Sequence, residues 1–357
     1  MAHQQLTNLP HDPLLDLEPW VGQRQASFRF ELINGVTEEK LGNITPLRTA
    51  TLSHDTTRTM KRQLNLDLGV ADHAAVNPIT DRILPFMTFP NGAEYPLGRY
   101  MFTDTSDLVT TSGRLSGMVL NDEMFLVDQE ITSAIPNAGL SAEFLITSIL
   151  NDMEDATVIY TLEPSEFSIS GNWSIGSNRG QILEAIAIQG DYFSPWFDNT
   201  GVMRFIRTFD PATRMPDFDW DEGNKVIRDN IIETSEILTA PNRFVVISND
   251  AADPTIEVTA TADIPATAPH SIANRGFVIA HVEDLQLSDN TQAQAVVEGI
   301  ANRMTVFERI GINTIPDPRH DSYNVIRWDG ANWLELAWSM PLEEGRAMSH
   351  LLRKAYS

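Results

Sequence analysis

The amino-acid sequence predicts an α+β protein in which β-strands predominate. Between residues 24 and 131, apolar and polar residues alternate in several short stretches, as in strands that bury one face. Residues 140–153 and 178–190 instead place apolar residues at helical spacing. Alternation returns in the last third of the chain. The order is therefore a β region, an α/β region and a second β region, without the short repeat of a solenoid.

Composition excludes several classes of protein. The chain has 357 residues, 42% of them apolar, which fits two or three globular domains. No run of 18 apolar residues occurs, so we expect no membrane insertion, and the first residues lack the basic and apolar regions of a signal peptide. The absence of cysteine excludes disulfides, cysteine-bound metals and a cysteine nucleophile.

The net charge of −24 argues against nucleic-acid binding. A nucleic-acid binder needs cations that displace counterions from phosphate, and this chain has 25 basic against 49 acidic residues. Acidity is concentrated between Asp104 and Glu166, where twelve acids and one base, Arg114, give a net charge of −11. Such a stretch is either a well-solvated surface or a wall that repels DNA.

An irregular segment precedes the first β region. Residues 1–23 contain prolines and scattered apolar side chains without helical or strand period, so we predict an extended arm that docks on another surface. The apolar residues of the arm are Leu6, Leu9, Leu14, Leu15, Leu17 and Trp20. Alternation then predicts strands, which are the stretches SFRFELING, TATLSHD, RQLNLDLG and LSGMVLND.

The middle of the chain contains two predicted helices and a hairpin. Ser141 is a possible N-cap for the helix at 140–153, and the helix at 178–190 ends at Gly190. The stretch DYFSPWFDNTGVMRFIRTF then predicts a hairpin whose turn is residues 198–201.

The last third of the chain returns to strands around one helix. RFVVISND, TIEVTATAD and GFVIAHVED are predicted strands. A helix is predicted from Thr291 to Arg309, with Ser288, Asp289 and Asn290 as possible N-caps. NVIRWDGANWLELAW follows as a hairpin around Asp329-Gly330.

The only candidate calcium loop is the stretch DFDWDEGNKVIR. Asp217, Asp219 and Asp221 occupy positions 1, 3 and 5 of an EF-hand pattern. However, Glu222 replaces the required glycine at position 6 and Arg228 replaces the acidic ligand at position 12. We therefore favour a strand with one wet face over a calcium site.

The segment PDPRHDSYNVIRW, residues 316–328, carries a dense set of chemically active side chains. These are Asp317, Arg319, His320 and Asp321. A hydrolase would need further ligands from elsewhere, and the eight histidines never pair at metal-ligand spacing. The structural alternative is a rigid turn in which Pro316 and Pro318 prevent a helix and Arg319 pairs with an aspartate or a neighbouring chain. We favour it, and expect no catalytic, cofactor-binding or metal-binding residue.

The order of several motifs resembles the tail hub proteins of long-tailed phages. SFRFELI, RTATLSHDTTRTMKRQLNLDL, YPLGRYMFTDTSD and RLSGMVLNDEMFLVDQEI resemble the opening segments of these hubs. GQILEAIAIQGDYFSPWFDNTGVMRF resembles their short helix and hairpin. RFVVISND, TAPHSIANRGF, SDNTQAQAVVEGIANRM and IPDPRHDSYNVIRW resemble their last part. The resemblance spans roughly residues 24–340.

The resemblance implies two tube-like β-barrel domains with intervening α/β hub segments. The predicted divisions are an arm at 1–23, a first tube-like domain at 24–135, an α/β hub region at 136–235, a second tube-like domain at 236–345 with the helix 291–309, and a tail at 346–357.

The function that the resemblance implies is structural. Three copies would form a ring at the virion tail tip, joining the sixfold tail tube to the distal tip and letting DNA pass. Expected partners are a hexameric distal tail or tube protein, the tape-measure protein and downstream fibre or tip proteins, with assembly beginning in the host cytoplasm. Many such hubs carry a C-terminal hydrolase, whereas this chain stops at Ser357, so we expect no enzymatic activity and no cofactor.

Two other functions remain open from the sequence. A carbohydrate-binding β module would use exposed aromatic rings, for which Trp328, Trp333 and Trp338 are candidates. However, Trp328 and Trp338 fall on the same face of the alternating hairpin pattern, which suits a core equally well. An acidic metal-dependent hydrolase would rest on the Asp217 cluster and the 316–328 segment.

Overall fold

A computed structural model of the chain shows a mostly β protein, with 43% strand and 16% helix. The α+β class predicted from alternation and helical spacing is therefore confirmed. The residues that the structure describes are 4–5, 26–69, 72, 75–110, 113–135, 139–153, 158–169, 171, 173–221, 226–235, 238–249, 257–285, 287, 290–304 and 308–354.

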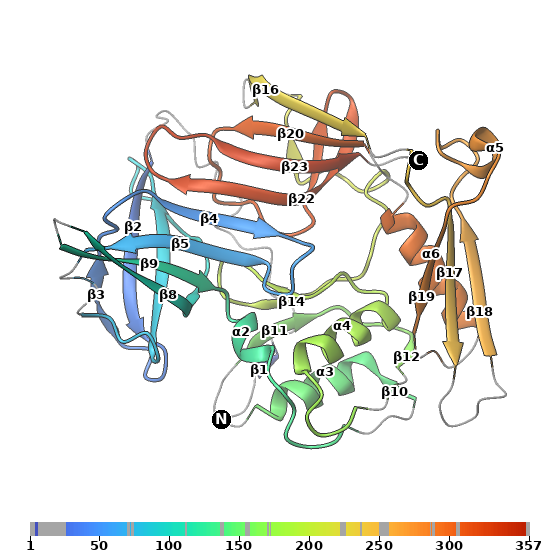
Figure 1. The fold of residues 1–357 in the computed structure, drawn as a ribbon, viewed down its shortest axis with the longest axis horizontal. Helices are drawn as coiled ribbons and strands as arrows, with labels where there is room; N and C mark the ends of the chain where they lie inside the picture. The colour runs from blue at the N-terminus through green and yellow to red at the C-terminus, as the bar shows by residue number, and fades with distance from the viewer. Residues whose placement is uncertain are drawn as a thin grey trace.

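One large sheet joins strands from both β regions (Figure 1). In order across the sheet, its strands are β16 (Val226–Ser235), β20 (Glu308–Thr314), β23 (Met348–Lys354), β22 (Ala331–Leu342), β4 (Ala50–Asp55), β5 (Arg62–Leu68), β9 (Gly113–Asn121), β8 (Tyr100–Thr110), β6 (Asp81–Thr88), β2 (Ser27–Asn34) and β3 (Lys40–Ile44). Three short strands lie off this path. β7 (Glu94–Pro96) pairs with β6, β21 (Val325–Trp328) pairs with β22, and β15 (Phe218–Asp219) pairs with β21. The described strands of this sheet do not close into a barrel.

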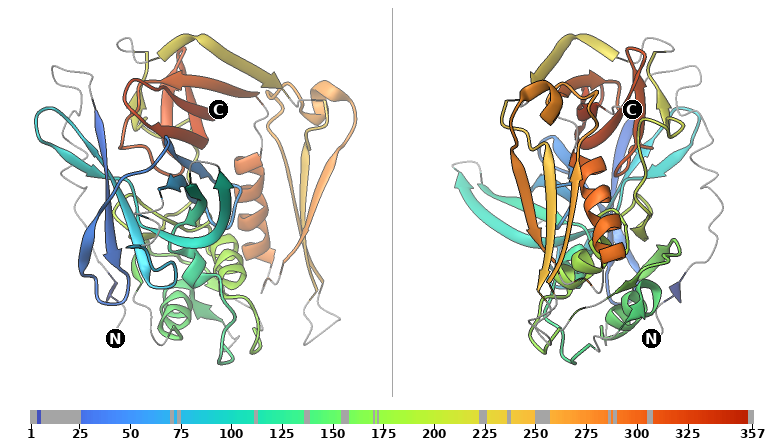
Figure 2. Two further views of the ribbon diagram at one scale, coloured as in Figure 1. Left: turned by 60° about the vertical axis from the view of Figure 1, so that its left-hand side comes forward. Right: turned by 90° about the vertical axis from the view of Figure 1, so that its right-hand side faces the viewer.

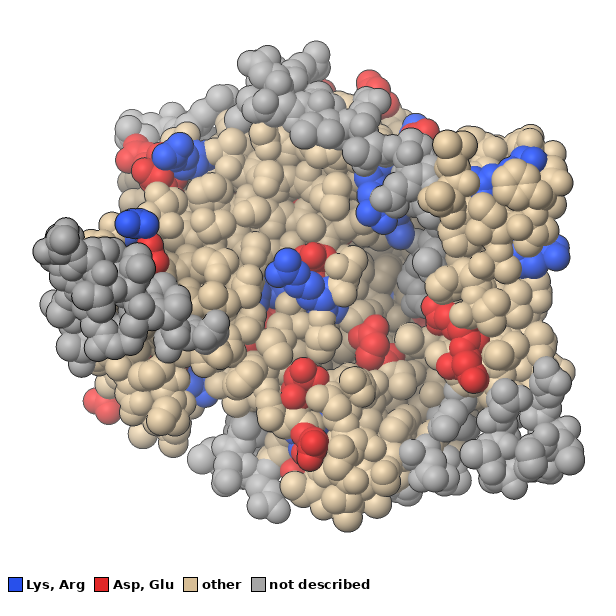
Figure 3. All heavy atoms as spheres, viewed as in Figure 1, with Lys and Arg blue, Asp and Glu red and all other residues tan. Residues whose placement is uncertain are grey.

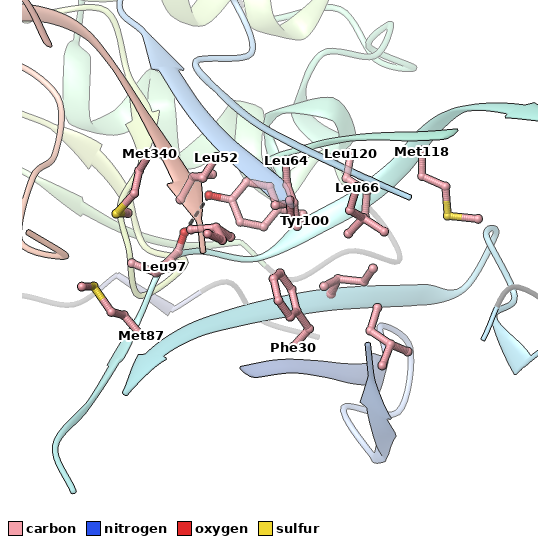
Figure 4. Close-up of a cluster of buried hydrophobic side chains, with 14 of the residues drawn as sticks. Phe30, Leu52, Leu64, Leu66, Met87, Leu97, Tyr100, Met118, Leu120 and Met340 are labelled. Atoms are coloured by element: carbon pink, nitrogen blue, oxygen red, sulfur yellow. Dashed lines mark hydrogen bonds between the residues drawn. The ribbon is translucent and has the colours of Figure 1, made fainter. Parts of the chain in front are cut away.

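The alternating strands of the first β region bury their apolar faces in one core. In β5, Leu64, Leu66 and Leu68 are at most 3% exposed, while the polar residues between them are half-buried. Side chains from β2, β4, β6, β8, β9 and the second half of β22 complete this first core (Figure 4). Tyr100 is buried there as well, and its hydroxyl donates to the Leu97 carbonyl at 2.6 Å, so this buried hydroxyl is satisfied.

A second core lies on the same sheet and is separated from the first by a β-bulge in β22. The pairing of β22 with β23 shifts register between Glu335 and Ala337. Before the bulge, Trp333 packs in the second core with residues from β15, β20, β21 and β23. After the bulge, Trp338 packs in the first core. The extra residue changes which alternate side chains of β22 point inward, from the odd-numbered ones before the bulge to the even-numbered ones after it. A single strand therefore contributes side chains to both cores.

The α/β part lies below the large sheet in Figure 1 and has a core of its own. Its helices are α2 (Met124–Val127), α3 (Ala142–Asn151) and α4 (Arg179–Gln189), and its strands are β1 (Gln4–Gln5), β10 (Leu140–Ser141), β11 (Ile159–Leu162), β12 (Ser168–Ile169), β13 (Trp196–Phe197) and β14 (Met203–Phe205). The predicted N-cap Ser141 accepts from the Phe144 amide, and Gly190 follows α4 as expected. Gln4 and Gln5, from the predicted arm, pair in parallel with β11 of the same chain.

A three-stranded sheet and one helix form the fourth unit. β17 (Arg243–Asn249) lies between β18 (Glu257–Asp263) and β19 (Ala280–Asp284), and the short α5 (Ile272–Arg275) precedes β19. Figure 2 shows α6 (Asn290–Met304) along this sheet. The helix buries one apolar face, formed by Ala293, Val296, Val297 and Ile300. The predicted helix end at 309 is wrong, because β20 begins at Glu308 and pairs there with β16 and β23.

No helix in the part of the chain that the structure describes is long and apolar enough to cross a membrane.

We expect the first core to dominate the stability of the β region. Leu52 is 0% exposed on β4, whereas Leu47 is 51% exposed. Leu52→Ala should lower the free energy of unfolding by about 2–5 kcal/mol, because it removes buried methyl groups and leaves a cavity. Leu47→Ala, the matched control, should change it by less than about 0.5 kcal/mol. Urea denaturation measures both, and equal effects would contradict this assignment of the core.

Candidate functional site

The segment that the sequence analysis singled out connects two strands rather than a helix and a strand. It runs from the end of β20 at Thr314 to the start of β21 at Val325. The proline rings fix φ at about −65° at Pro316 and at Pro318, which begins a turn, and Tyr323 adopts a left-handed conformation at φ 60° near the end of the segment. We call residues 315–324 the loop. Its backbone conformation is restricted where it passes the second core.

Arg319 pairs inside the loop. Its Nε and Nη2 atoms donate to the two carboxylate oxygens of Asp317 at 2.9 and 2.6 Å, and its backbone amide donates to the same carboxylate at 3.0 Å. Burial by itself raises the pKa of Asp317, but the hydrogen bonds from Arg319 outweigh it and the pKa is lowered. Of the partners that the sequence left open for Arg319, the structure selects this local one.

Asp321 instead reaches across the molecule to a buried arginine. Its Oδ1 atom accepts from Arg62 Nη2 at 2.6 Å and from Trp196 Nε1 at 2.9 Å. Arg62 lies on β5 with a side chain that is 0% exposed, and Trp196 lies on β13 in the α/β part. A guanidinium does not lose its proton in a protein, so this buried positive charge requires the carboxylate.

Asn199 completes the contact between the three parts of the chain. It sits in the predicted hairpin turn, and its side-chain amide donates to the carbonyls of Pro318 and His320 at 2.9 and 3.1 Å. Its Oδ1 atom accepts from Arg62 Nη1. We call Arg62, Trp196, Asn199 and Asp321 the junction, because they join β5, the β13–β14 hairpin and the loop.

His320 points away from the junction into a buried cluster with Glu335 and His350. The Nδ1 atom of His320 lies 2.8 Å from Glu335 Oε2, and that of His350 lies 2.5 Å from Glu335 Oε1. All three side chains are at most 3% exposed. The ring of Phe218 stacks on that of His320, with the ring centroids 4.1 Å apart. The ring of Trp220 lies edge-on to that of His350, with the centroids 4.9 Å apart. We call His320, Glu335 and His350 the His–Glu–His cluster.

Burial shifts the pKa values of this cluster strongly. It raises the pKa of Glu335 to about 7 and lowers that of His320 to about 4. The pKa of His350 is lowered as well, again chiefly by burial. Each shift favours the neutral form, so near neutral pH both imidazoles are uncharged.

Sequence reasoning missed the cluster because its members share no local spacing. His320 comes from the loop, Glu335 from β22 and His350 from β23. Glu335 faces the core only because the bulge after it changes the parity of β22. The one available signal was a charged residue inside the otherwise apolar stretch NWLELAW.

The carboxylates of the candidate calcium loop bind backbone amides of the neighbouring hairpin. Asp217 accepts from the Val325 amide at 2.8 Å, and Asp221 accepts from the Gly330 amide at 3.0 Å. Phe218 and Trp220, between them, are buried. This alternation agrees with the predicted strand with one wet face. The structure does not describe residues 222–225, which include the glycine position of the EF-hand pattern.

The tryptophans proposed for sugar stacking lie in the cores. Trp333 and Trp338 are 6% and 3% exposed, and Trp328 is half-buried against the second core. Among the described residues, Trp196 and Trp220 are also buried and Trp173 is half-buried. No described tryptophan is therefore fully exposed, as a ring that stacks on a sugar at the surface would be; Trp20 lies outside the described residues.

The fold matches solved tail proteins over nearly the whole chain. The prophage MuSo2 43 kDa tail protein from Shewanella oneidensis superposes with a TM-score of 0.60 at 11% identity, covering 92% of this chain and 98% of that one. The tail protein from Neisseria meningitidis has a TM-score of 0.59 at 9% sequence identity, and the match covers 93% of this chain and 97% of that one. A prophage tail protein from Listeria monocytogenes has a TM-score of 0.58 at 7% identity, and the match covers 91% of this chain and 94% of that one.

The chain has the fold of phage tail proteins. This confirms, for the fold, the resemblance found in the order of the sequence motifs. No protein-family model matches the sequence, and no curated protein sequence matches it significantly. At identities of 7–11%, what this chain shares with these tail proteins is the arrangement of strands and helices.

We expect Arg62 and Asp321 to be strongly coupled in stability. Asp321→Ala should lower the free energy of unfolding by about 3–5 kcal/mol, because it leaves the buried Arg62 guanidinium without a counterion. Arg62→Met should lower it by less, because the Asp321 side chain is 26% exposed and water can solvate its charge. The double variant should lower the free energy of unfolding by clearly less than the sum of the two single effects. Urea denaturation of the four proteins measures the coupling.

The exposed Arg243–Asp263 pair provides the control for this cycle. It has similar geometry, with Arg243 Nε 2.6 Å from Asp263 Oδ1, but both side chains are about two-fifths exposed. Arg243→Met, Asp263→Ala and their double variant should change the free energy of unfolding only slightly, and the two single effects should add, because solvent screens the pair. Additive effects at Arg62 and Asp321 would show that the junction is not an energetic unit.

Proposed function

We propose that this chain is a structural hub of a phage tail tip that assembles as a trimeric ring between the tail tube and the distal tip. The observation that carries the proposal is the shared fold with three tail proteins over at least 91% of both chains. The sequence motifs that resemble tail hubs occur in the same order along the chain.

Two separate cores on the large sheet support the expected pair of tube-like domains. The first core gathers β2, β4–β6, β8 and β9, and the second gathers β15 and β20–β23. We propose that each half of the sheet acts as one tube-like unit, so that three chains offer six units to a sixfold tube. The unit of β17–β19 and α6, with its own core, would lie beside them as part of the hub.

The charge distribution fits a protein that DNA passes without binding. Three chains would carry 3 × −24 = −72 charges. Figure 3 shows no continuous basic patch across the described side chains of that face, and acidic groups lie mainly over its lower half, near α3 and α4. Salt screens charges beyond about 8 Å, so these groups act on DNA only where they come that close to it.

A rigid interior also suits this function. The junction clamps the β region, the α/β part and the loop to one another through Arg62, Asn199 and Asp321. A ring that passes load from tube to tip needs subunits whose parts keep a fixed relation. The proposed partners remain the tube or distal tail protein, the tape-measure protein and the fibre or tip proteins.

We expect the chain to form a trimer. Closed cyclic symmetry is how identical chains build a ring, and three chains of 39.8 kDa make about 119 kDa. Light scattering across a concentration series, together with cryo-electron microscopy of particles that contain the chain, measures mass and symmetry. A threefold ring at the end of the tail tube is the expected result, whereas twofold or sixfold symmetry of this chain in the particle would refute the proposal.

A further inference from the structure

The His–Glu–His cluster has a composition that the hub function does not require. Its three side chains come from the loop, β22 and β23, and their ligand-type atoms all lie within 4.8 Å of one another. The junction uses the backbone carbonyl of His320, while the imidazole faces Glu335 instead. Two histidines and one glutamate are a recurrent protein donor set for zinc, with one tetrahedral position left for water.

The hydrogen bonds around His350 prepare it to act as a ligand. The Thr314 hydroxyl donates to the Ile315 carbonyl at 3.0 Å. Its oxygen lies 2.7 Å from His350 Nε2, so it can accept the ring proton from that nitrogen. In the tautomer with the proton on Nε2, the Nδ1 lone pair faces Glu335 Oε1 at 2.5 Å, where a proton or a cation must lie between the two atoms. Metal-binding histidines are commonly held by a hydrogen bond on the other ring nitrogen in this way.

The Glu335 carboxylate is buried between the two imidazoles. Its side chain is 0% exposed, and its two described hydrogen-bond partners through the carboxylate are His320 and His350. A buried carboxylate with neither a proton nor a cation beside it is costly. One divalent ion among the three ligand-type atoms would supply that charge, because imidazole nitrogens and carboxylate oxygens both bind zinc.

We propose that His320, Glu335 and His350 form a structural binding site for one divalent transition-metal ion of the zinc type. The Nδ1 atoms of both histidines and the carboxylate of Glu335 are the ligands. The ion would fasten the loop to β22 and β23 beside the bulge, and thereby fix Asp321 in the junction. This site is independent of the proposed assembly, because it lies wholly within one chain.

The metal content of the purified full-length chain tests the proposal directly. Protein expressed in zinc-supplemented medium and passed through gel filtration should contain about one zinc per chain by inductively coupled plasma mass spectrometry. Removal of the ion with a chelator should lower Tm, and added Zn²⁺ should restore it, because an ion that binds only the folded state stabilises it. Cobalt(II) in place of zinc should give the visible spectrum of a four-coordinate site.

Three variants and one control separate the site from adventitious binding. Glu335→Gln and His350→Gln should abolish stoichiometric zinc. Thr314→Val removes the acceptor for His350 Nε2 and should weaken zinc binding about 10–100-fold. The control is His281→Gln, which alters a histidine that contacts Glu283 at 2.9 Å but is one-third exposed. It should leave zinc content unchanged.

The wild-type chain alone decides the question if a variant fails to fold. A folded wild-type protein that contains no zinc, and whose Tm responds neither to Zn²⁺ nor to chelator, would overturn the proposal and assign the cluster to a proton shared between Glu335 and its histidines. Zinc that binds equally well to the wild-type chain and to a folded Glu335→Gln variant would overturn it too, since the ion would then lie elsewhere. Neither result would bear on the trimeric ring.

Discussion

The buried positive charge of Arg62 is the constraint on which the tertiary structure depends. Its guanidinium is 0% exposed and cannot be neutralised by losing a proton. Among the described residues, it donates hydrogen bonds to Asn199 in the hairpin turn and to Asp321 in the loop, which are 137 and 259 residues away in sequence. The fold is therefore stable only when the β region, the α/β part and the last β region meet at one point. A misplacement of any one of them would leave a charge buried without a counterion.

The β-bulge in β22 is the second feature that organises the molecule. β22 is the strand by which the last part of the chain joins the first β region, because it pairs with both β23 and β4. The shift between Glu335 and Ala337 turns Trp333 into the second core and Trp338 into the first. The same shift turns a carboxylate inward, where it meets two histidines. One local irregularity thus divides the sheet into two cores and creates the His–Glu–His cluster at their boundary.

The similarity to tail proteins at 7–11% identity follows from the same physics. Alternating strands and amphipathic helices need only apolar residues of suitable volume at given positions, so many sequences fit one architecture. Binding surfaces and charge patterns are under no such general rule. The fold is therefore shared even where little sequence identity remains.

Local chemistry determined the elements of this protein. Alternation placed β4, β5, β17 and β18, helical spacing placed α3 and α4, with Ser141 as the cap of α3, and turn residues placed the hairpins. The end of α6 was missed, because the pairing of β20 with two neighbouring strands prevailed over helical spacing. The strand predicted from Gly276 begins only at Ala280. The local pair of Arg319 with Asp317 was one of the partners that the sequence allowed.

Only the tertiary structure decided which distant residues meet. Nothing near Asp321 in the sequence points to Arg62, and no spacing links His320 to Glu335 and His350. These contacts arise because β5, the hairpin turn and the loop converge, and because a bulge alters the parity of one strand. Periodicity reports which face of an element is buried, since burial repeats with the local backbone geometry. It carries no information on which element lies opposite, and the buried charges of this protein depend on that.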